Sequence, residues 1–282
     1  MFPFKKRVVV KTILITRSDV LTDSLNVNTV WQQRHVPQNL PFVLSRAILL
    51  SSNDPLEFSL TQYLQSQAAS VPSAQPLYSF SFDHHAGVSG NIWHKGADYQ
   101  IDIKGMPERV LELCDMSENE RESIMLQVQA MSSKGLYVIA LASGASRRSV
   151  KQMSDLAAKE KLSFTGLIGL RLEVSPAARQ CLKMTRTKNI AVYLTTGLHP
   201  TVAYYLSKEV ELANRPNDVF DMRRAEITHR EQMHTIVDQH AVFARASSQH
   251  KNRLLNELKN IDPNTNTVDS IETYQKLLAA TP

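Results

Sequence analysis

The stretch Ile103-Lys104-Gly105-Met106-Pro107-Glu108 decides the fold, because it marks a strand that turns into a helix. Proline is favoured in the first turn of a helix, where a backbone N–H would have no partner in any case. Gly105 lets the backbone approach a ligand, and Lys104 offers a point charge at the same place. The stretch therefore predicts a ligand contact, although a simple strand-to-helix turn with a solvated lysine also fits these residues.

The chain on either side of this turn predicts regular elements. Residues 92–94 and 99–103 form a strand pair, and a helix follows at 109–114. Other predicted strands lie at 8–15, 78–82, 136–142 and 190–194, and other predicted helices lie at 42–51, 117–134 and 176–187. Ser117 begins a capping box, and Gly135 is placed to end that helix.

Composition places the chain among globular proteins. Its 282 residues suffice for one large or two medium domains, with 43% hydrophobic and 21% charged residues. The apolar run 136–142 is far below the roughly 20 residues of a membrane span. The only cysteines, Cys114 and Cys181, form neither a disulfide framework nor a zinc spacing, which fits a reducing cytoplasm. The net charge of +5 comes without an Arg-rich helix or interleaved aromatic residues, so we expect no nucleic-acid partner.

Several motifs resemble those of the P-type cation-transporting ATPases, in the order in which that family has them. Residues 104–108 resemble the family's K-G-A-P-E, and residues 162–170 resemble its L-x-F-x-G-L-V-G-L. Residues 242–251 are similar to V-F-A-R-x-S-P-x-x-K, and residues 54–60 are similar to D-P-T-E-x-A-L.

The resemblance implies an α/β fold of two domains. A haloacid dehalogenase-like Rossmannoid phosphorylation domain would comprise residues 1–31 and 160–282. An inserted α+β antiparallel nucleotide-binding domain would comprise residues 32–159. Nothing in the sequence resembles the family's membrane helices or actuator domain, so we expect no membrane span and no transport by this chain alone.

The resemblance also implies a nucleotide site in the inserted domain. Phe82 would stack on adenine, Glu57 would lie on the adenine side, and Lys104 and Gly105 would contact the nucleotide. A buried core ring explains Phe82 equally well, and a first-turn carboxylate favoured by the helix dipole explains Glu57.

Two basic phosphate contacts of the family are missing, because Ala86 and Tyr137 stand in their places. His84, His85 and His94 do not complete a metal-ligand set.

The phosphorylation loop D-K-T-G-T-L-T aligns with residues 16–22, so Thr16 stands where the family has its phosphorylated aspartate. A threonine hydroxyl is a poor nucleophile without an adjacent base, and it brings no charge for Mg²⁺. Asp19 lies three positions further on in the loop. Leu198 likewise replaces the aspartate of the family's T-G-D-x-P motif.

Some phosphate contacts of the family remain in the sequence. Thr196 and Gly197 would present hydroxyl and N–H groups to a phosphate, and Lys251 would hold the phosphoryl group. An ordinary strand-to-helix turn and a surface lysine are the alternatives. The tail 262–267 lacks the glycines and the spacing of the family's Gly-Asp-Gly-x-Asn-Asp strand end, which carries the Mg²⁺ aspartates.

The leading hypothesis is therefore a non-catalytic P-type-ATPase-like protein, a pseudoenzyme. It would bind ATP weakly, or act as a regulatory partner of a protein such as a cation pump, and the lost aspartates argue against Mg²⁺. One alternative is a Mg²⁺-dependent ATP hydrolase or phosphatase that uses Asp19 beside Lys251. Another alternative is an interaction module with a dead pocket.

Overall fold

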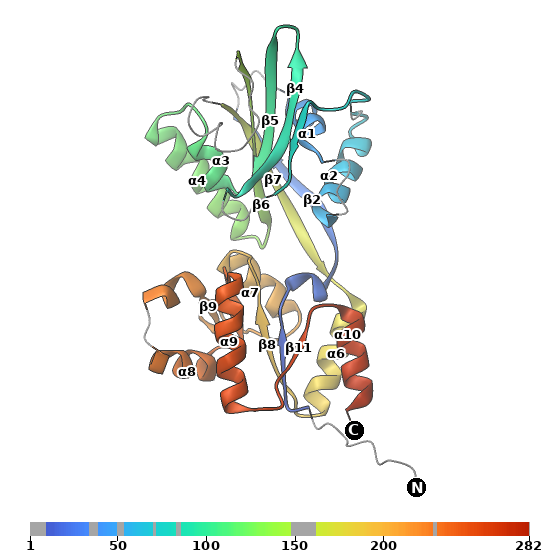
Figure 1. Ribbon diagram of the computed structural model, residues 1–282, viewed down its shortest axis with the longest axis vertical. Coiled ribbons are helices and arrows are strands. Elements are labelled where there is room, and N and C mark those ends of the chain that lie inside the picture. Colours follow the sequence, from blue (N-terminus) through green and yellow to red (C-terminus); the bar gives the residue numbers. More distant parts are fainter. Residues whose placement is uncertain are drawn as a thin grey trace. The chain divides into compact units, whose positions relative to one another are not determined.

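The computed structural model divides the chain into two compact units, and each is considered by itself (Figure 1). It describes residues 10–33, 39–49, 54–69, 72–82, 86–147, 162–227 and 230–281. One unit comprises Met1–Ser24 with Leu172–Pro282, and the other comprises Leu25–Arg171. The mixed α/β class is confirmed, since the first unit holds a parallel sheet and the second an antiparallel one.

The division between the units falls inside two long strands, β2 (Thr22–Trp31) and β7 (Ser163–Val174). The borders expected from the sequence lay at 31/32 and 159/160, near the outer ends of these strands. Both strands run across the division without a break that the sequence could mark, and the domain borders stay predictions.

The first unit has a five-stranded parallel sheet in the order β11-β1-β8-β10-β9. Its strands are β1 (Thr12–Ile15), β8 (Ala191–Thr195), β9 (Val219–Asp221), β10 (Val242–Ala244) and β11 (Asn266–Val268). Successive side chains of β1 point to opposite faces. Ile13 and Ile15 accordingly join one buried cluster, whereas Leu14 joins the other.

Helices cover both faces of the parallel sheet. They are α6 (Pro176–Thr187), α7 (Pro200–Glu209), α8 (Arg230–Gln239), α9 (Ser248–Ile261) and α10 (Ile271–Ala280). The cluster that contains Ile13 takes its helix residues from α6, α7 and α10, and the cluster that contains Leu14 takes them from α8 and α9. In Figure 1, α8 and α9 accordingly lie on the opposite side of the sheet from α6 and α10. Short 3-10 turns lie at Ser18–Val20, Pro216–Asp218 and Met222–Ile227.

The tail forms an element that the sequence analysis did not assign. Residues 266–268 pair with β1 in parallel register, Ile15 lying opposite Val268. Asn-Thr-Val is too short and too polar to be identified as a strand from its own pattern. The tail therefore supplies a strand beside β1, although it lacks the glycine-rich sequence expected there.

The second unit has a six-stranded sheet in the order β2-β7-β6-β5-β4-β3. Its other strands are β3 (Tyr78–Phe80), β4 (Val88–Lys95), β5 (Asp98–Gly105) and β6 (Tyr137–Ser146). The predicted hairpin is confirmed, with β4 and β5 paired along their whole length. Val88 lies opposite Gly105 at the end of the hairpin that leads into the helix.

Two pairs of helices cover the antiparallel sheet. Helices α1 (Leu40–Ala47) and α2 (Pro55–Ser66) share a buried cluster on one face, and α3 (Pro107–Glu112) and α4 (Glu118–Ser132) share one on the other (Figure 1). The predicted capping box at Ser117 is confirmed, and at the start of α2 the side chain of Asp54 accepts from Leu56 N.

Within the described ranges, no helix combines the length and the apolar character needed to cross a membrane. His84 and His85, which were weighed as metal ligands, lie outside the described residues.

Candidate functional site

Lys104 lies in the interior of the antiparallel unit, with 1% of its surface exposed. Its Nζ is 2.8 Å from Glu57 Oε1, 2.8 Å from the carbonyl oxygen of Ala47 and 3.3 Å from Ser89 Oγ. An ammonium has three donors, so these three acceptors satisfy it completely. Lys104 is thus neither a solvated charge nor a free donor; burial lowers its pKa, and Glu57 opposes that shift.

Glu57 belongs to the first turn of α2 and is also buried, with 5% exposed. Its second carboxylate oxygen accepts from the backbone N–H of Leu49 at 3.1 Å. The carboxylate therefore connects β5, through Lys104, to the chain that leaves α1. This role goes beyond the exposed first-turn charge that the sequence also allowed.

A second buried ion pair lies beside the first. Asp102 is two residues before Lys104 on β5, on the same face of the sheet, and it is fully buried. Its two carboxylate oxygens accept from Arg46 Nε at 2.7 Å and Arg46 Nη2 at 2.8 Å. Ser143 Oγ donates to the same carboxylate at 2.6 Å, so the charge is well hydrogen-bonded.

Side chains of the sheet also complete the end of α1. The last carbonyl groups of a helix have no partner within the helix. Asn91 donates to the carbonyl oxygens of Arg46 and Ile48 at 2.7 Å each, and Lys104 donates to that of Ala47. Buried polar groups on this face therefore hold the end of α1 against β4 and β5.

Gly105 has a packing reason to be glycine. A Cβ atom at this position would lie 2.3 Å from the carbonyl oxygen of Gly87 and 2.7 Å from Val88 Cα. The same carbonyl accepts from Met106 N at 2.8 Å. The close approach at this turn is between two backbone segments of this unit, and a ligand contact of Gly105 stays a prediction.

Phe82 follows β3 and is 38% exposed. Since Phe80 pairs with Gly90 on the antiparallel strand β4, the chain at Phe82 leads toward the Val88–Gly105 end of the hairpin. A partly exposed ring beside this end can stack on a planar ligand, which a fully buried core ring could not.

Tyr137, which stands where the family has an arginine, is the first residue of β6. Burial, followed by the negative charges of Asp54 and Glu108, raises the pKa of Tyr137 to about 12. Its hydroxyl therefore stays neutral at physiological pH, and it cannot replace the charge of an arginine.

In the parallel unit, the loops after β1 and β8 meet at the carboxyl edge of the sheet. Thr16 N and Thr16 Oγ1 both donate to the carbonyl oxygen of Val268, at 3.0 and 3.2 Å. Thr196 is 1% exposed, its N–H donates to the carbonyl oxygen of Phe243, and its hydroxyl accepts from Leu198 N at 3.1 Å. Both threonines thus take part in backbone hydrogen bonds of the edge.

Gly197 and Leu198 differ in their surroundings. A Cβ atom at Gly197 would have no other atom within 4 Å, so there is open space beside it. Leu198 packs against the buried cluster of the parallel unit, and its carbonyl accepts from Arg245 N at 3.0 Å. The Leu198 side chain, which the resemblance aligns with the family's aspartate, therefore belongs to the core of this unit.

Charged residues gather at the same edge. Arg17 Nε donates to Asp19 Oδ1 at 3.0 Å, and its Nη2 also donates to the carboxylate. This hydrogen bonding is the main reason that the pKa of Arg17 is raised, and Asp269, just after β11, adds to it. Burial lowers the pKa of Lys251 on α9; the charge of Arg17 lowers it further, and Asp19 opposes the shift.

These residues do not fit a Mg²⁺ ion of the kind that the resemblance implies. The hydroxyl of Thr16 donates to Val268, and the carboxylate of Asp19 is held by Arg17. Within the described part of the chain, no three or more His, Cys, Asp or Glu side chains come together as metal ligands. A hard cation needs several free oxygen ligands, and a guanidinium at the same place repels it.

Arg46, Asp102 and Asp269 are site residues that were not predicted from the sequence. A signal for Asp102 existed, because Asp102 and Lys104 are polar residues two apart within an apolar strand, which puts both on one buried face. Arg46 lies in a helical pattern that does not distinguish it, and Asp269 follows a strand that was not identified.

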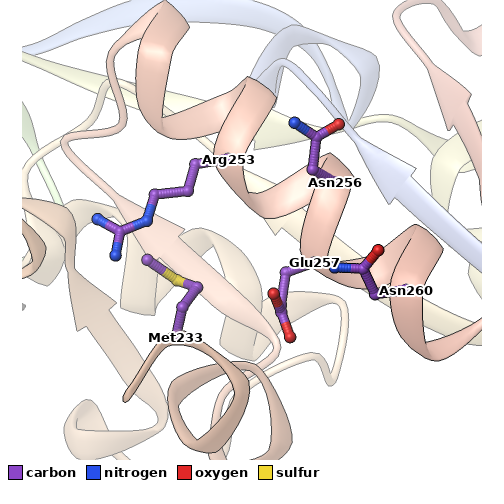
Figure 2. A pocket seen from close by; sticks show the side chains of 5 residues that line it. All are labelled: Met233, Arg253, Asn256, Glu257 and Asn260. Atoms are coloured by element: carbon purple, nitrogen blue, oxygen red, sulfur yellow. The ribbon is translucent and has the colours of Figure 1, made fainter. Parts of the chain in front are cut away.

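A pocket of about 500 Å³ lies between α8 and α9, lined by Met233, Arg253, Asn256, Glu257 and Asn260 (Figure 2). His234 Nδ1 is 3.2 Å from Glu257 Oε1 beside it. None of the site residues predicted from the sequence is among its described lining residues.

Comparisons with known proteins agree with the resemblance over part of the chain. Residues 51–173 match the family described as P-type ATPase, cytoplasmic domain N. A probable cation-transporting P-type ATPase of Mycoplasma genitalium is 23% identical over 223 residues, which cover 74% of this chain and 24% of that protein. Probable cation-transporting ATPase F of Mycobacterium tuberculosis is 27% identical over 190 residues, 63% of this chain and 21% of that protein.

A third relative is the sodium/potassium exporting P-type ATPase cta3 of Schizosaccharomyces pombe. It is 28% identical over 120 residues, which cover 40% of this chain and 12% of that protein. The chain thus spans about a quarter or less of the length of these relatives.

Proposed function

We propose that this chain, a relative of the P-type cation-transporting ATPases over part of its length, is a non-catalytic cytoplasmic protein that binds the adenosine end of a nucleotide weakly. The observation that carries the proposal is the threonine at the end of β1. Thr16 has a hydroxyl and no carboxylate to act as a nucleophile, and this hydroxyl donates to the carbonyl oxygen of Val268. Phosphoryl transfer depends almost wholly on positioning and on charge stabilisation, so this loss removes the chemistry.

In this proposal the parallel unit is a haloacid dehalogenase-like domain, and the antiparallel unit is its inserted nucleotide-binding domain. The strand order β11-β1-β8-β10-β9 supports the first assignment, because it brings Thr16, Thr196 and the start of α9 to one carboxyl edge. The match of residues 51–173 supports the second.

The nucleotide would be bound by its base, with Phe82 as the stacking ring. Base–aromatic stacking contributes about 1–3 kcal/mol, which alone gives weak binding. Lys104 and Glu57, which are buried and paired with each other, would support this part of the sheet without touching the base. The phosphates would add little to the binding free energy, since Ala86 and Tyr137 replace the family's basic residues.

Calorimetric titration with adenosine, ADP and ATP tests this proposal. We expect millimolar or weaker affinity that differs by less than about threefold among the three ligands, and loss of binding in Phe82→Ala. Val30→Ala is a control, because Val30 has a similar exposure of 36% on another strand of this unit. ATP binding that is tenfold tighter than adenosine binding, or unaffected by Phe82→Ala, would contradict the proposal.

The rival function is a Mg²⁺-dependent hydrolase that uses Asp19. The electrostatic proximity of Asp19 to Lys251 favours it, whereas the pairing of Asp19 with Arg17 opposes it. Phosphate release from ATP or p-nitrophenyl phosphate, abolished in Asp19→Ala, would establish the hydrolase. The proposed function predicts that neither the unmodified protein nor Asp19→Ala releases phosphate.

Weak nucleotide binding without chemistry suits a regulatory partner of another protein, such as a cation pump. Co-purification of a pump with the intact chain, reduced by Phe82→Ala or by ATP, would support that role. Co-purification that is indifferent to both would instead indicate an interaction module with a dead pocket.

A further inference from the structure

The pocket between α8 and α9 is lined by a cation and an anion from the same helix. Arg253 and Glu257 are four residues apart on α9, so their Cβ atoms lie about 5–6 Å from each other. Figure 2 shows both side chains on the side of α9 that faces Met233, which belongs to α8. In this view Met233 lies between the guanidinium and the carboxylate. The pocket therefore has a positive end, a negative end and an apolar floor.

The carboxylate of Glu257 is held in place and keeps an oxygen for a ligand. Its side chain is 15% exposed, and His234 Nδ1 lies 3.2 Å from Oε1. Across the part of the chain that the structure describes, no other group bonds to this carboxylate, so Oε2 can accept from a ligand. A carboxylate that has lost most of its water is stabilised by a further donor, above all by a charged one.

The guanidinium of Arg253 stays separate from this carboxylate. A pair between them would be possible at this spacing, although arginine before glutamate is the less favourable order along a helix. Among the described residues, however, Glu257 pairs only with His234. A guanidinium has five donors in a planar fork, so Arg253 can bind the carboxylate of a ligand in addition to its contacts within the chain.

The floor and the edge of the pocket add apolar and amide groups. Met233 is 1% exposed and belongs to the buried cluster that contains Ile236 and Leu254. Its flexible thioether adapts to apolar groups of different shape. Asn256 and Asn260 also line the pocket, and each carboxamide both donates and accepts. The volume of about 500 Å³ is typical of a site for a small molecule.

We propose that this pocket binds a small zwitterion that carries an ammonium and a carboxylate, as a free amino acid or a dipeptide does. The carboxylate of the ligand binds to Arg253, its ammonium binds to Glu257 Oε2, and its aliphatic side chain contacts Met233. A ligand with a single charge leaves one end of the pocket unsatisfied, so the pocket selects against it. The site belongs to the parallel unit and does not depend on nucleotide binding by the other unit.

NMR titrations that follow the side-chain amide signals of Asn256 and Asn260 test the site. L-Leucine should bind about tenfold more tightly than L-leucinamide, which lacks the carboxylate, and than N-acetyl-L-leucine, which lacks the ammonium. Glycine should bind about tenfold more weakly than leucine, because it lacks the aliphatic side chain. Leucyl-leucine separates the two sources of the ligand. Tighter binding than that of leucine would indicate a dipeptide, and weaker or equal binding would indicate a free amino acid.

Two variants assign the two charges of the ligand. Arg253→Gln should bind leucine and leucinamide with equal affinity, yet still prefer leucine to N-acetyl-leucine. Glu257→Gln should bind leucine and N-acetyl-leucine equally, yet still prefer leucine to leucinamide. The preference that remains in each variant shows that the variant is folded. If Arg253→Gln does not fold, Arg253→Lys serves instead, and it should reduce the preference over leucinamide without abolishing it.

Lys259→Gln and Glu272→Gln are matched controls, because they make the same changes of charge at exposed positions of α9 and α10. Both should leave leucine affinity unchanged. No shift at millimolar leucine, equal binding of leucine, leucinamide and N-acetyl-leucine, or an Arg253→Gln variant that keeps the preference over leucinamide would overturn the proposal. None of these failures would affect the adenosine titration, which concerns Phe82.

Discussion

The position of Lys104 at a strand-to-helix turn could be predicted from the sequence, but its buried contacts could not. The turn motif locates it at the end of β5, but only the packing shows that its three donors are all used by α1, α2 and β4. A buried ion pair is weak support for stability as a whole, yet removing one partner leaves an uncompensated charge. Lys104 is therefore sensitive to substitution whether or not a nucleotide binds.

Lys104→Met should lower the free energy of unfolding of the antiparallel unit by about 3–5 kcal/mol, because Glu57 remains buried and unpaired. Urea unfolding followed by circular dichroism measures this. Lys95→Met, at an exposed position of the neighbouring strand, should change the value by less than about 0.5 kcal/mol. Adding Glu57→Leu to Lys104→Met should recover part of the loss; a further drop would contradict the account.

Cys114 gives a pH-dependent prediction at the same scale. Burial raises the pKa of this thiol to about 12, and its sulfur lies 3.1 Å from the carbonyl oxygen of Val110. The folded chain therefore keeps the proton above pH 9, where an unfolded chain loses it, so the folded state binds more protons and stability falls as pH rises.

Iodoacetamide at pH 9 should leave Cys114 unmodified in the folded protein and alkylate it in urea, as mass spectrometry would show. The fall in unfolding free energy between pH 9 and 11 should be smaller in Cys114→Ala. Rapid alkylation of the folded chain, or an unchanged slope in the variant, would show that the thiol is not held in this way.

At the scale of elements, the tail is the part that the sequence concealed. Strand β11 and helix α10 place Val268, Tyr274 and Leu278 in the buried cluster of the parallel unit. These residues complete the sheet beside β1, so the tail belongs to the fold and is not an appendage.

Tyr274→Ala should therefore lower the free energy of unfolding of the parallel unit by about 3–5 kcal/mol, as for other large buried side chains. Lys276→Ala, exposed on the same helix, should have an effect below about 0.5 kcal/mol. Denaturant unfolding of both variants provides the measurement. Equal effects would mean that α10 does not pack as described.

Elements with a local signal could be predicted from the sequence. Ser117 and Pro176 mark predicted helix starts through a capping box and a first-turn proline, and the structure begins helices at Glu118 and Pro176. The predicted strand over 8–15 is confirmed over Thr12–Ile15, whereas the described residues Val10 and Lys11 lie before the strand begins. Short strands such as β9, β10 and β11 lack a periodic pattern of their own, because partners distant in sequence stabilise them.

The site was harder to predict from the sequence than the fold, because its contacts also join residues that are distant in sequence. Single residues such as Glu57 and Lys104 could be proposed, but their mutual contact depends on tertiary packing between α2 and β5. The pairing of Arg17 with Asp19 is local, yet its proximity to Lys251 arises only when α9 packs on the sheet.

For the whole molecule, the arrangement of connections matters most. The chain enters the antiparallel unit through β2 and leaves it through β7, and these strands are neighbours in its sheet. The ends of this unit are therefore held close by its own hydrogen bonds, and it has two buried clusters of its own.

A fragment of residues 22–174 should accordingly fold by itself. In the full chain, Lys104→Met should lower the melting temperature of the antiparallel unit. The melting temperature of the fragment should agree within a few degrees with that of this unit in the full chain, because the contacts that stabilise the unit lie within it. Circular dichroism melting of the fragment and of the intact protein tests this. A fragment without cooperative melting would show that the parallel unit is required.

The hydrogen bond from Ser175 N to the carbonyl oxygen of Leu21, 3.0 Å long, has a consequence for the order of folding. In the unfolded chain, these two residues are separated by the entire antiparallel unit, and closing so long a loop is entropically slow. Once that unit has formed, β2 and β7 bring the flanking segments together and the loop becomes short. The parallel sheet should therefore refold only after the antiparallel unit. In stopped-flow experiments, Lys104→Met should slow the refolding phases of both units, although Lys104 lies only in the antiparallel unit.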